Sequence, residues 1–307
     1  MPRRQDLPPG GVSERGGDGE AVSRVLTWFR NEGRVLPWRQ AGVSAWGVLV
    51  SEVMLQQTPV ARVLPAWLSW MERWPSPQSM AEASAADAVR AWGRLGYPRR
   101  AQRLRECAIA IVRDHGGRVP ASELQLRELP GVGEYTAAAV VAFAFGGRTT
   151  VLDTNVRRVI ARAWSGEALP PQHLTRSERE RAAGLVPEDP AVSVQWNVGA
   201  MELGALVCTA RAPRCEACPL VGRCVWFAAG RPLPDTRARP AQSWVGSDRQ
   251  VRGRVLALLR DVLGPVNISG QASLKDVEPG QLDRCLASLL ADGLVRLESP
   301  ERGTYAL

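Results

Sequence analysis

Four cysteines in one short segment are the residues of this sequence best suited to bind a metal. Cys208, Cys215, Cys218 and Cys224 have the spacing C-x6-C-x2-C-x5-C, which brings four thiolates within reach of one compact centre. Four soft sulfur ligands suit either a cubane iron–sulfur cluster or a tetrahedral zinc ion. Structural zinc loops more often contain two C-x2-C pairs separated by a longer insert, and this segment has one such pair. The spacing therefore favours the cluster, with zinc as the alternative.

Three arginines, Arg211, Arg214 and Arg223, lie between or beside these cysteines. A bound metal would stiffen the loop, and the loop would then present their guanidinium groups to phosphate. Solvated loop charges are the simpler interpretation of the same residues. The remaining cysteines, Cys107 and Cys285, lie in helical patterns, where we expect small buried hydrophobic residues rather than ligands.

A single carboxylate, Glu52, lies in the strongly apolar run over residues 48–58, VLVSEVMLQQT. Burial disfavours the charged form of a carboxyl group, which raises its pKa and keeps a proton available near neutral pH. Glu52 is thus a candidate general acid. The alternative is a glutamate at the edge of a helix or paired with an arginine.

A glycine-containing turn and a second carboxylate follow each other along the chain. Residues 129–137 (LPGVGEYTA) place Gly131 and Gly133 between two helical patterns, where a tight turn exposes backbone N–H groups that can bind phosphate. An apolar helix over 136–145 and a Gly-Gly break lead to Asp153 in the string VLDTNV. Asp153 precedes a periodic run and is a favoured helix N-cap, a role that a catalytic carboxylate can fill at the same time.

Helices must position these residues. Apolar residues recur at three- and four-residue spacing from about residue 21 onward, and again over 45–55, 60–71, 88–95, 104–112 and 136–145. Turn signals such as Trp74-Pro75-Ser76-Pro77 separate these runs, and no alternating pattern long enough for a sheet occurs before residue 248. We therefore predict an all-α main body.

The composition changes after the cysteine segment. Residues 230–240 (GRPLPDTRARP) are rich in Pro and Arg and suit a linker. Helical patterns over 249–262, near Leu274 and over 281–292 precede two short apolar runs, 294–297 and 304–307, which predict a two-stranded wing. We expect a disordered tail over 1–20, a main domain over 21–228 with its metal loop at 208–224, a linker over 229–248 and a winged-helix-like α+β domain over 249–307. Winged helices bind DNA or pack against proteins, and the sequence leaves both open.

The charge of the chain favours a polyanionic partner such as nucleic acid. The 307 residues include 39 Lys and Arg against 31 Asp and Glu, a net charge of +8. The longest apolar uncharged stretch, residues 135–147, is shorter than the roughly 18 residues that suggest a membrane span. The N-terminal segment has no apolar signal region. We expect a soluble cytoplasmic protein, bacterial in type and nucleoid-associated, whose cysteines bind metal rather than form disulfides.

Several strings together resemble the MutY family of adenine DNA glycosylases, which are helix-hairpin-helix enzymes of the endonuclease III superfamily. They are LPWR at Trp38 and Arg39, SEVMLQQT at Glu52, LGY at Tyr97, the hairpin with its aspartate, and the cysteine spacing. The resemblance covers about residues 21–228. It implies the helix-hairpin-helix glycosylase fold, a [4Fe-4S] cluster on the four cysteines, and a monomeric enzyme that acts on double-stranded DNA with A·G or A·8-oxoguanine mispairs.

The resemblance also implies roles for single residues. Glu52 protonates the flipped adenine at N7, and Asp153 stabilises positive charge at the sugar, electrostatically or through a transient covalent state. Bifunctional relatives carry a Schiff-base lysine after the second hairpin glycine, where this chain has Tyr135, so we expect a monofunctional enzyme. The expected catalytic residues are Glu52, Asp153, Tyr135 and Asn155, and the expected substrate or DNA contacts are Trp38, Arg39, Leu55, Gln57, Thr58, Tyr97, Gly131 and Gly133, of which Gln57 and Tyr97 insert into the duplex.

Two features depart from the family pattern. Longer members continue into a Nudix-like domain that reads 8-oxoguanine, whereas the tail here has the winged-helix-like pattern, which puts a strong preference for 8-oxoguanine in question. Val198 stands where the family often has a polar side chain, so adenine recognition would depend more on Glu52, Arg39 and Trp38. The alternatives are a thymine or uracil mismatch glycosylase on the same scaffold and a non-catalytic iron–sulfur DNA-binding module.

Overall fold

The computed structural model describes residues 17–233 and 244–307, and this part of the chain is mainly helical. The chain forms two compact units that do not follow the order of the sequence. The first unit consists of Met1–Leu49, Pro120–Glu128 and Val132–Arg237, and the second unit of Val50–Val119, Leu129–Gly131 and Ala238–Leu307. Helix α2 (Ala45–Leu55) begins in the first unit and ends in the second.

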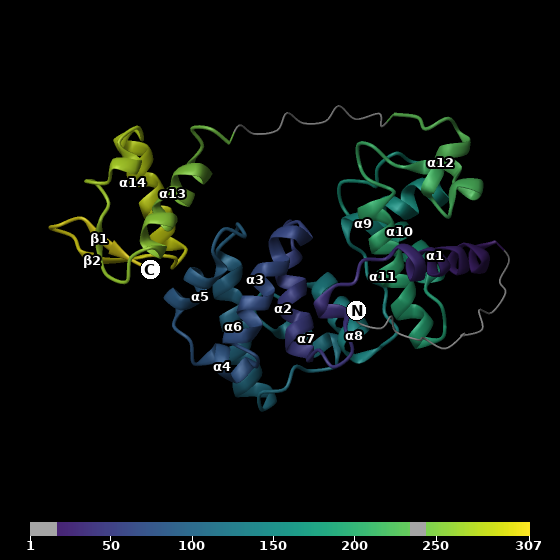
Figure 1. Ribbon diagram of the computed structural model, residues 1–307, viewed down its shortest axis with the longest axis horizontal. Coiled ribbons are helices and arrows are strands. Elements are labelled where there is room, and N and C mark those ends of the chain that lie inside the picture. The colour runs from purple at the N-terminus through teal and green to yellow at the C-terminus, as the bar shows by residue number, and fades with distance from the viewer. Residues whose placement is uncertain (1–16, 234–243) are drawn as a thin grey trace. The chain divides into compact units, whose positions relative to one another are not determined.

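The first unit is built on three helices that share one apolar core. Val25 of α1 (Asp18–Glu32) belongs to one buried cluster with residues of α9 (Thr154–Ile160) and α11 (Pro190–Leu206). Figure 1 shows α1 beside α11. α11 approaches α9 closely at Gly204, where an added Cβ would lie 2.6 Å from the carbonyl oxygen of Asn155. The other elements of this unit are α7 (Glu123–Glu128), α8 (Glu134–Phe145), α10 (Arg176–Leu185), α12 (Val225–Ala228) and the helical turns η1 (Pro37–Arg39), η2 (Ala161–Ser165), η3 (Cys215–Ala217) and η4 (Val221–Arg223).

Buried tryptophans hold together the helical part of the second unit. The Trp70 ring packs edge-on against Trp74 and Trp92, with centroid distances of 4.6 and 5.6 Å. Edge-to-face aromatic pairs of this kind stabilise a core beyond the area that they bury. Trp74 lies in the loop that follows α3 and Trp92 is the last residue of α5, so these pairs join α3 to both. The helices of this part are α3 (Val60–Arg73), α4 (Pro77–Ala81), α5 (Ala85–Trp92) and α6 (Arg99–His115).

The C-terminal part of the second unit combines helices with a small antiparallel sheet. Strand β3 (Thr304–Ala306) lies between β1 (Val266–Asn267) and β2 (Arg296–Ser299), and Tyr305 faces Val266 on one side and Leu297 on the other. Its apolar core includes Val89 of α5, so this part packs on the helices of its own unit. This arrangement agrees with the predicted winged-helix-like α+β domain. Its helices are α13 (Asp248–Arg260), α14 (Pro279–Ala291) and the turn η5 (Ala272–Leu274).

The structure corrects three details of the sequence prediction. α1 begins at Asp18, inside the predicted tail, because the Asp18 carboxylate accepts hydrogen bonds from Trp164 and Arg223. The predicted two-stranded wing has a third strand, β1, whose two residues are too few to show an alternating pattern. The helix expected near Leu274 is a single turn. Residues 1–16 of the predicted tail and 234–243 of the predicted linker lie outside the described residues.

No helix in the described ranges is both long enough and apolar enough to cross a membrane.

Candidate active site and iron–sulfur loop

Asp153 is the N-cap of α9, as its position in the sequence predicts, and both of its carboxylate oxygens accept hydrogen bonds. Oδ1 accepts from the backbone N–H groups of Asn155 (2.9 Å) and Val156 (2.7 Å), and Oδ2 accepts from the side-chain amide of Asn155 (2.7 Å). Desolvation by burial raises the pKa of Asp153, against the lowering effect of these bonds and of the Arg158 cation. The carboxylate is therefore fixed in orientation, with a pKa above the usual aspartate value.

Arg158, on the same helix, joins this carboxylate to the cysteine loop. Its buried side chain donates to Asn155 Oδ1 (2.8 Å), to the carbonyl oxygen of Gly204 (2.7 Å) and to that of Cys208 (2.6 Å). Asn155 in turn donates to Asp153. A continuous chain of hydrogen bonds thus runs from the backbone of Cys208 to the Asp153 carboxylate. Arg158 was not among the site residues expected from the sequence.

The segment before Asp153 is held by a buried amide, Asn197 of α11. Its Nδ2 donates to the carbonyl oxygen of Thr149 (2.9 Å), and its Oδ1 accepts from the backbone N–H of Val151 (3.2 Å). Val151 also belongs to a small apolar cluster with α8, and the half-buried Tyr135 packs against this cluster. Tyr135 and the segment that leads to Asp153 thus pack in the same apolar cluster.

The hairpin turn has the backbone that its glycines allow. Gly131 has a φ of +78°, and an added Cβ would lie 3.0 Å from the Cβ of Arg103, so both conformation and space favour glycine there. Gly133 is exposed and is the N-cap of α8, where no side chain caps the first N–H groups. Free N–H groups at a helix N-terminus form a natural phosphate site.

Glu52 lies on α2 and is 4 % exposed, which agrees with the burial expected from the sequence. The neighbouring Leu49, Val53 and Met54 are buried as well. Glu52 therefore remains the candidate general acid.

The loop after α2 and the loop before α6 both expose a residue with a left-handed backbone. Gln57 has a φ of 54° and Tyr97 has a φ of 47°. Leu55 is the last residue of α2 and is partly buried, whereas Thr58 is buried and donates to the carbonyl oxygen of Leu95 (3.2 Å). Gln57 and Tyr97 are the strained residues here, and strained backbone of this kind is often found at functional sites.

Trp38 and Arg39 lie in η1, and Arg39 is engaged by a buried carboxylate. Trp38 is 3 % exposed. Glu202 of α11, 1 % exposed, accepts a hydrogen bond from Arg39 (3.1 Å) and two from the Arg34 side chain (2.9 and 2.7 Å). Burial acts to raise the pKa of Glu202, but the bonds from Arg34 and the two cations outweigh it, so the pKa lies below the usual value. The structure thus shows a structural role for Arg39, the expected substrate contact.

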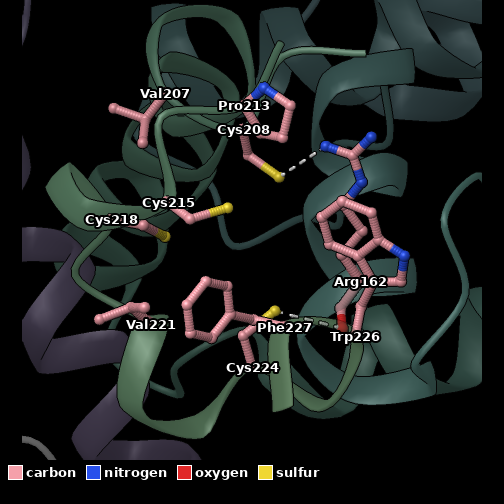
Figure 2. Close-up of a pocket in the computed structure, with 10 residues that line it drawn as sticks. All are labelled: Arg162, Val207, Cys208, Pro213, Cys215, Cys218, Val221, Cys224, Trp226 and Phe227. Carbon is pink, nitrogen blue, oxygen red and sulfur yellow. Dashed lines mark hydrogen bonds between the residues drawn. The ribbon is translucent and has the colours of Figure 1, made fainter. Parts of the chain in front are cut away.

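The four cysteines surround one small cavity in the first unit. Figure 2 shows their sulfur atoms facing the same space, which is closed by Arg162, Val207, Pro213, Val221, Trp226 and Phe227. Within residues 17–233 and 244–307, no group of three or more His, Cys, Asp or Glu side chains is arranged to hold a single metal ion. Four sulfur atoms that line one compact space fit a thiolate-bound metal centre.

The chemistry of the thiols also fits a cationic group. Burial raises the pKa of Cys218 to about 12 and also raises the pKa of Cys224, so their thiolates need a nearby positive charge. Iron ions would supply that charge. Cys107 and Cys285 are both buried, as expected, and lie outside the cavity.

Arg162 forms one wall of the cavity and contacts a ligand sulfur. Its Nη1 donates to Cys208 Sγ (3.4 Å) and to the carbonyl oxygen of Thr209 (2.7 Å), and its guanidinium lies 4.4 Å from the centroid of the Trp226 ring (Figure 2). A buried cation that donates to a ligand sulfur stabilises thiolate charge.

Two of the three arginines that could face phosphate have partners within the protein. Arg223 pairs with Asp18, and Arg214 donates to the carbonyl oxygen of Leu206. Arg211 is exposed. The local pattern did not reveal the first two partners, because Asp18 lies far away in the sequence and Leu206 offers only a backbone oxygen.

Comparison with known proteins places the chain in a family. Residues 50–183 match the HhH-GPD superfamily of base excision DNA repair proteins, and residues 208–224 match the iron–sulfur binding domain of endonuclease III. The chain is 48 % identical over 283 residues to the adenine DNA glycosylase of Mycolicibacterium smegmatis, and the match covers 92 % of this chain and 94 % of that protein. The chain belongs to the adenine DNA glycosylases of the HhH-GPD superfamily.

Two further matches agree with this assignment of the glycosylase. The adenine DNA glycosylase of Mycobacterium tuberculosis is 50 % identical over 273 residues, with 89 % of each chain covered. The solved structure of a thermostable thymine-DNA glycosylase is 30 % identical, with a TM-score of 0.62 over 68 % of this chain and 95 % of that chain. The glycosylase is thus a DNA repair enzyme that hydrolyses an N-glycosidic bond, and its four loop cysteines are the ligands of a [4Fe-4S] cluster.

The residues expected at the site are divided between the two units of the glycosylase. Gly133, Tyr135, Asp153 and Asn155 lie in the first unit, with Trp38, Arg39 and the cysteines, and Glu52, Leu55, Gln57, Thr58, Tyr97 and Gly131 lie in the second. Residues that the sequence did not single out, among them Arg100 and Arg158, are polar side chains that bond to distant backbone oxygens. Such partners leave no motif in a single sequence.

Proposed function

We propose that this glycosylase removes adenine paired with guanine or 8-oxoguanine in double-stranded DNA, acts as a monomer and leaves the strand intact. The names of its relatives support adenine as the base. The observation that carries the proposal is the pair of carboxyl groups. Glu52 is 4 % exposed, and Asp153 is held by three hydrogen bonds at a helix N-terminus. A buried carboxyl group is suited to donate a proton, and the hydrogen bonds fix the Asp153 carboxylate in orientation.

In the proposed reaction, Glu52 transfers its proton to N7 of the extruded adenine. The C1′–N9 bond breaks, and its electron pair goes to the base. The sugar then carries oxocarbenium character, which the Asp153 carboxylate stabilises electrostatically or as a transient covalent adduct. Water adds to C1′, and the proton that it loses returns to Glu52, so the enzyme is regenerated.

Two residues behind Asp153 act on the carboxylate rather than on the substrate. Asn155 holds one carboxylate oxygen by its amide, and Arg158 holds Asn155. The cluster, when bound to its four cysteines, cross-links the loop to which Arg158 also bonds through the Cys208 carbonyl. We infer that this support keeps the carboxylate on the side of the sugar where positive charge develops.

Adenine must leave the base stack before it reaches these groups. Extrusion costs a few kcal/mol and costs less at a mismatch, which favours mispaired sites. Gln57 and Tyr97 are exposed side chains suited to enter the duplex and contact the opposite base. The exposed N-terminus of α8 beside Gly133 is suited to bind a backbone phosphate.

Strand cleavage by β-elimination needs an amine that forms a Schiff base with the sugar. Tyr135 occupies the position on the hairpin helix at which the resemblance implies a lysine in bifunctional relatives. A phenol cannot form that intermediate. We therefore expect base release without strand scission.

Single-turnover base release from defined duplexes tests the proposal. Wild-type protein should release adenine from A·8-oxoguanine and A·G pairs, and Glu52→Gln should slow release by about 10²–10⁴-fold, the usual contribution of a general acid. Glu106→Gln makes the same side-chain change at an exposed site on α6 and is the matched control. Release of thymine or uracil but not adenine would support the alternative glycosylase. Duplex binding without any base release would refute an enzymatic role.

A further inference from the structure

Two exposed loops of the second unit contain residues in a strained backbone conformation. Gln57 follows α2 with a φ of 54°, and Tyr97 precedes α6 with a φ of 47°. Tyr97 is 49 % exposed, so its own burial cannot hold it in place. Residues other than glycine keep such a conformation only where neighbouring contacts impose it. The structure must therefore contain groups that hold both loops.

The guanidinium of Arg100 holds the first loop. Its Nη1 donates to the carbonyl oxygens of Val53 (2.8 Å), Met54 (3.1 Å) and Gln56 (2.6 Å). These oxygens lie at the C-terminal end of α2, where helical carbonyls lack partners within the helix and favour a cation. Arg100 thus caps the helix that carries Glu52 and fixes the residue before Gln57.

The same guanidinium holds the second loop. Its Nη2 donates to the carbonyl oxygen of Gly96 (3.1 Å), the residue before Tyr97, and to the hydroxyl of Thr58 (2.9 Å). Thr58 in turn donates to the carbonyl oxygen of Leu95 (3.2 Å). The residues that flank Gln57 and Tyr97 are therefore tied to one another through a single side chain.

The chemistry of Arg100 suits this position better than lysine would. Its guanidinium lies 5.2 Å from the centroid of the Trp92 ring and 5.5 Å from that of Tyr97. Burial lowers the pKa of Arg100 to about 10, which still leaves it charged at neutral pH. A planar fork reaches acceptors in two directions, whereas a lysine offers its donors from one nitrogen. Arg100 also lies in the first turn of α6, where a cation opposes the helix dipole, so helix stability does not explain it.

We propose that Arg100 is a positioning residue that fixes Gln57 and Tyr97 relative to each other and to the end of the helix that carries Glu52. The proposal rests on the proposed function, in which these two side chains enter the duplex as adenine leaves it. Five hydrogen bonds converge on one guanidinium, so a displacement of either loop strains the other. Arg100 itself touches neither the base nor the sugar in this scheme.

Two other arginines provide graded controls. Arg62 donates to the carbonyl oxygen of Arg94 (2.6 Å), which belongs to the second loop. Arg105, on the same helix as Arg100 and also half-buried, donates to the carbonyl oxygen of Ala83, away from both loops. Alanine at these three positions separates loss of an arginine from loss of the link between the loops.

Excision from two duplexes tests the role in base extrusion. Arg100→Ala should slow adenine release from an A·G pair by roughly 10- to 100-fold, the scale expected when reacting groups are displaced by about 1 Å. With adenine opposite an abasic site, where no partner base holds it, the loss should be less than about threefold. Arg100→Lys should give an intermediate loss on the A·G duplex, and Arg105→Ala should give no loss on either.

Hydrogen exchange of the free proteins supplies a readout that does not depend on activity. Arg100→Ala should speed backbone exchange over 56–58 and 94–97 together, Arg62→Ala over 94–97 alone, and Arg105→Ala over neither. Unchanged hydrogen exchange in a folded Arg100→Ala protein, or equal slowing of adenine release from both duplexes, would overturn the proposal. Arg100→Lys replaces the alanine variant in both experiments if that variant does not fold. Wild-type protein that releases no adenine would refute the proposed function instead, while the exchange result would still decide whether Arg100 links the loops.

Discussion

Replacing Asn155 with alanine should slow catalysis more than it weakens DNA binding. The change removes the amide that donates to Asp153 Oδ2 (2.7 Å) and the oxygen that accepts from Arg158 (2.8 Å). The backbone donors of residues 155 and 156 remain, so Asp153 should still cap α9. One of its two carboxylate oxygens would lose its orientation.

The expected size of the effect follows from the bond that is lost. A hydrogen bond to a charged group contributes about 1.5–3 kcal/mol, which corresponds to roughly 10- to 150-fold in rate. Asp153 keeps its two backbone donors when the amide is lost, so we expect the lower end, about 10-fold.

The pH dependence should change as well. The Asn155 amide lowers the pKa of Asp153, so its loss should raise that pKa further. In the proposed mechanism catalysis needs the ionised carboxylate, and the rate should therefore fall as the pH falls through this pKa. In the variant the fall should begin at higher pH, so the loss of rate relative to the wild type should be largest at the acid end of the profile.

Single-turnover adenine release across the pH range, with denaturant unfolding beside it, measures these effects. Thr154→Ala changes an exposed neighbour in the same turn and should leave the rate and the profile unchanged. An Asn155→Ala protein with the wild-type rate and profile would show that Asp153 is not the reacting carboxylate or does not need its amide partner. An equal loss of rate at every pH would contradict the assigned cause.

Three further predictions concern other parts of the molecule. Cys218→Ser should remove the broad visible absorption of an iron–sulfur cluster, because a hydroxyl is a poor ligand for iron; a colourless wild-type protein that contains zinc would contradict the cluster. Glu202→Gln should lower the unfolding free energy at neutral pH by roughly 3 kcal/mol. This is the lower end of the range for breaking a buried ion pair, because the partner Arg34 is 34 % exposed. The depressed pKa of Glu202 means that this difference should shrink as the pH falls below the usual glutamate range, which denaturant unfolding at several pH values can check. The exposed Arg249 guanidinium lies 5.9 Å from the centroid of the ring of Tyr97, a residue proposed to enter the duplex, so we expect it to lie near the DNA backbone. Arg249→Ala should therefore weaken duplex binding and reduce its salt dependence by about one phosphate contact.

Features that depend on local spacing could be predicted from the sequence. The cysteine loop, the N-cap role of Asp153 and the glycine turn before α8 each follow from residues within one short segment. The burial of Glu52 followed from the apolar run around it. In these cases the determining interactions are between near neighbours, and a single sequence contains both partners.

Features that depend on distant partners could not be predicted. Arg158, Arg100 and Glu202 become site residues only because backbone oxygens or cations from other segments meet them. The boundary of α5 shows the same limit on a smaller scale. The apolar pattern continues to Leu95, which is buried, but the helix stops at Trp92 because Gly93 adopts a φ of +55°. Periodicity reports which residues are buried, not whether the backbone between them stays helical.

Hydrogen bonds link the cysteine loop to Asp153, and we therefore propose that the cluster supports the catalytic site. Arg158 is buried, and its acceptors include the carbonyl oxygens of Gly204 and Cys208 and the amide oxygen of Asn155. Displacement of the loop would leave a buried cation without one of its acceptors, and such a group costs too much to remain where it is. Arg158 would then move, and its hydrogen bond to Asn155 would break. Asn155 would lose the support with which it holds Asp153. As iron is removed, the excision rate should therefore fall before the helical circular dichroism signal does, because orientation of the carboxylate fails at smaller displacements than helix packing.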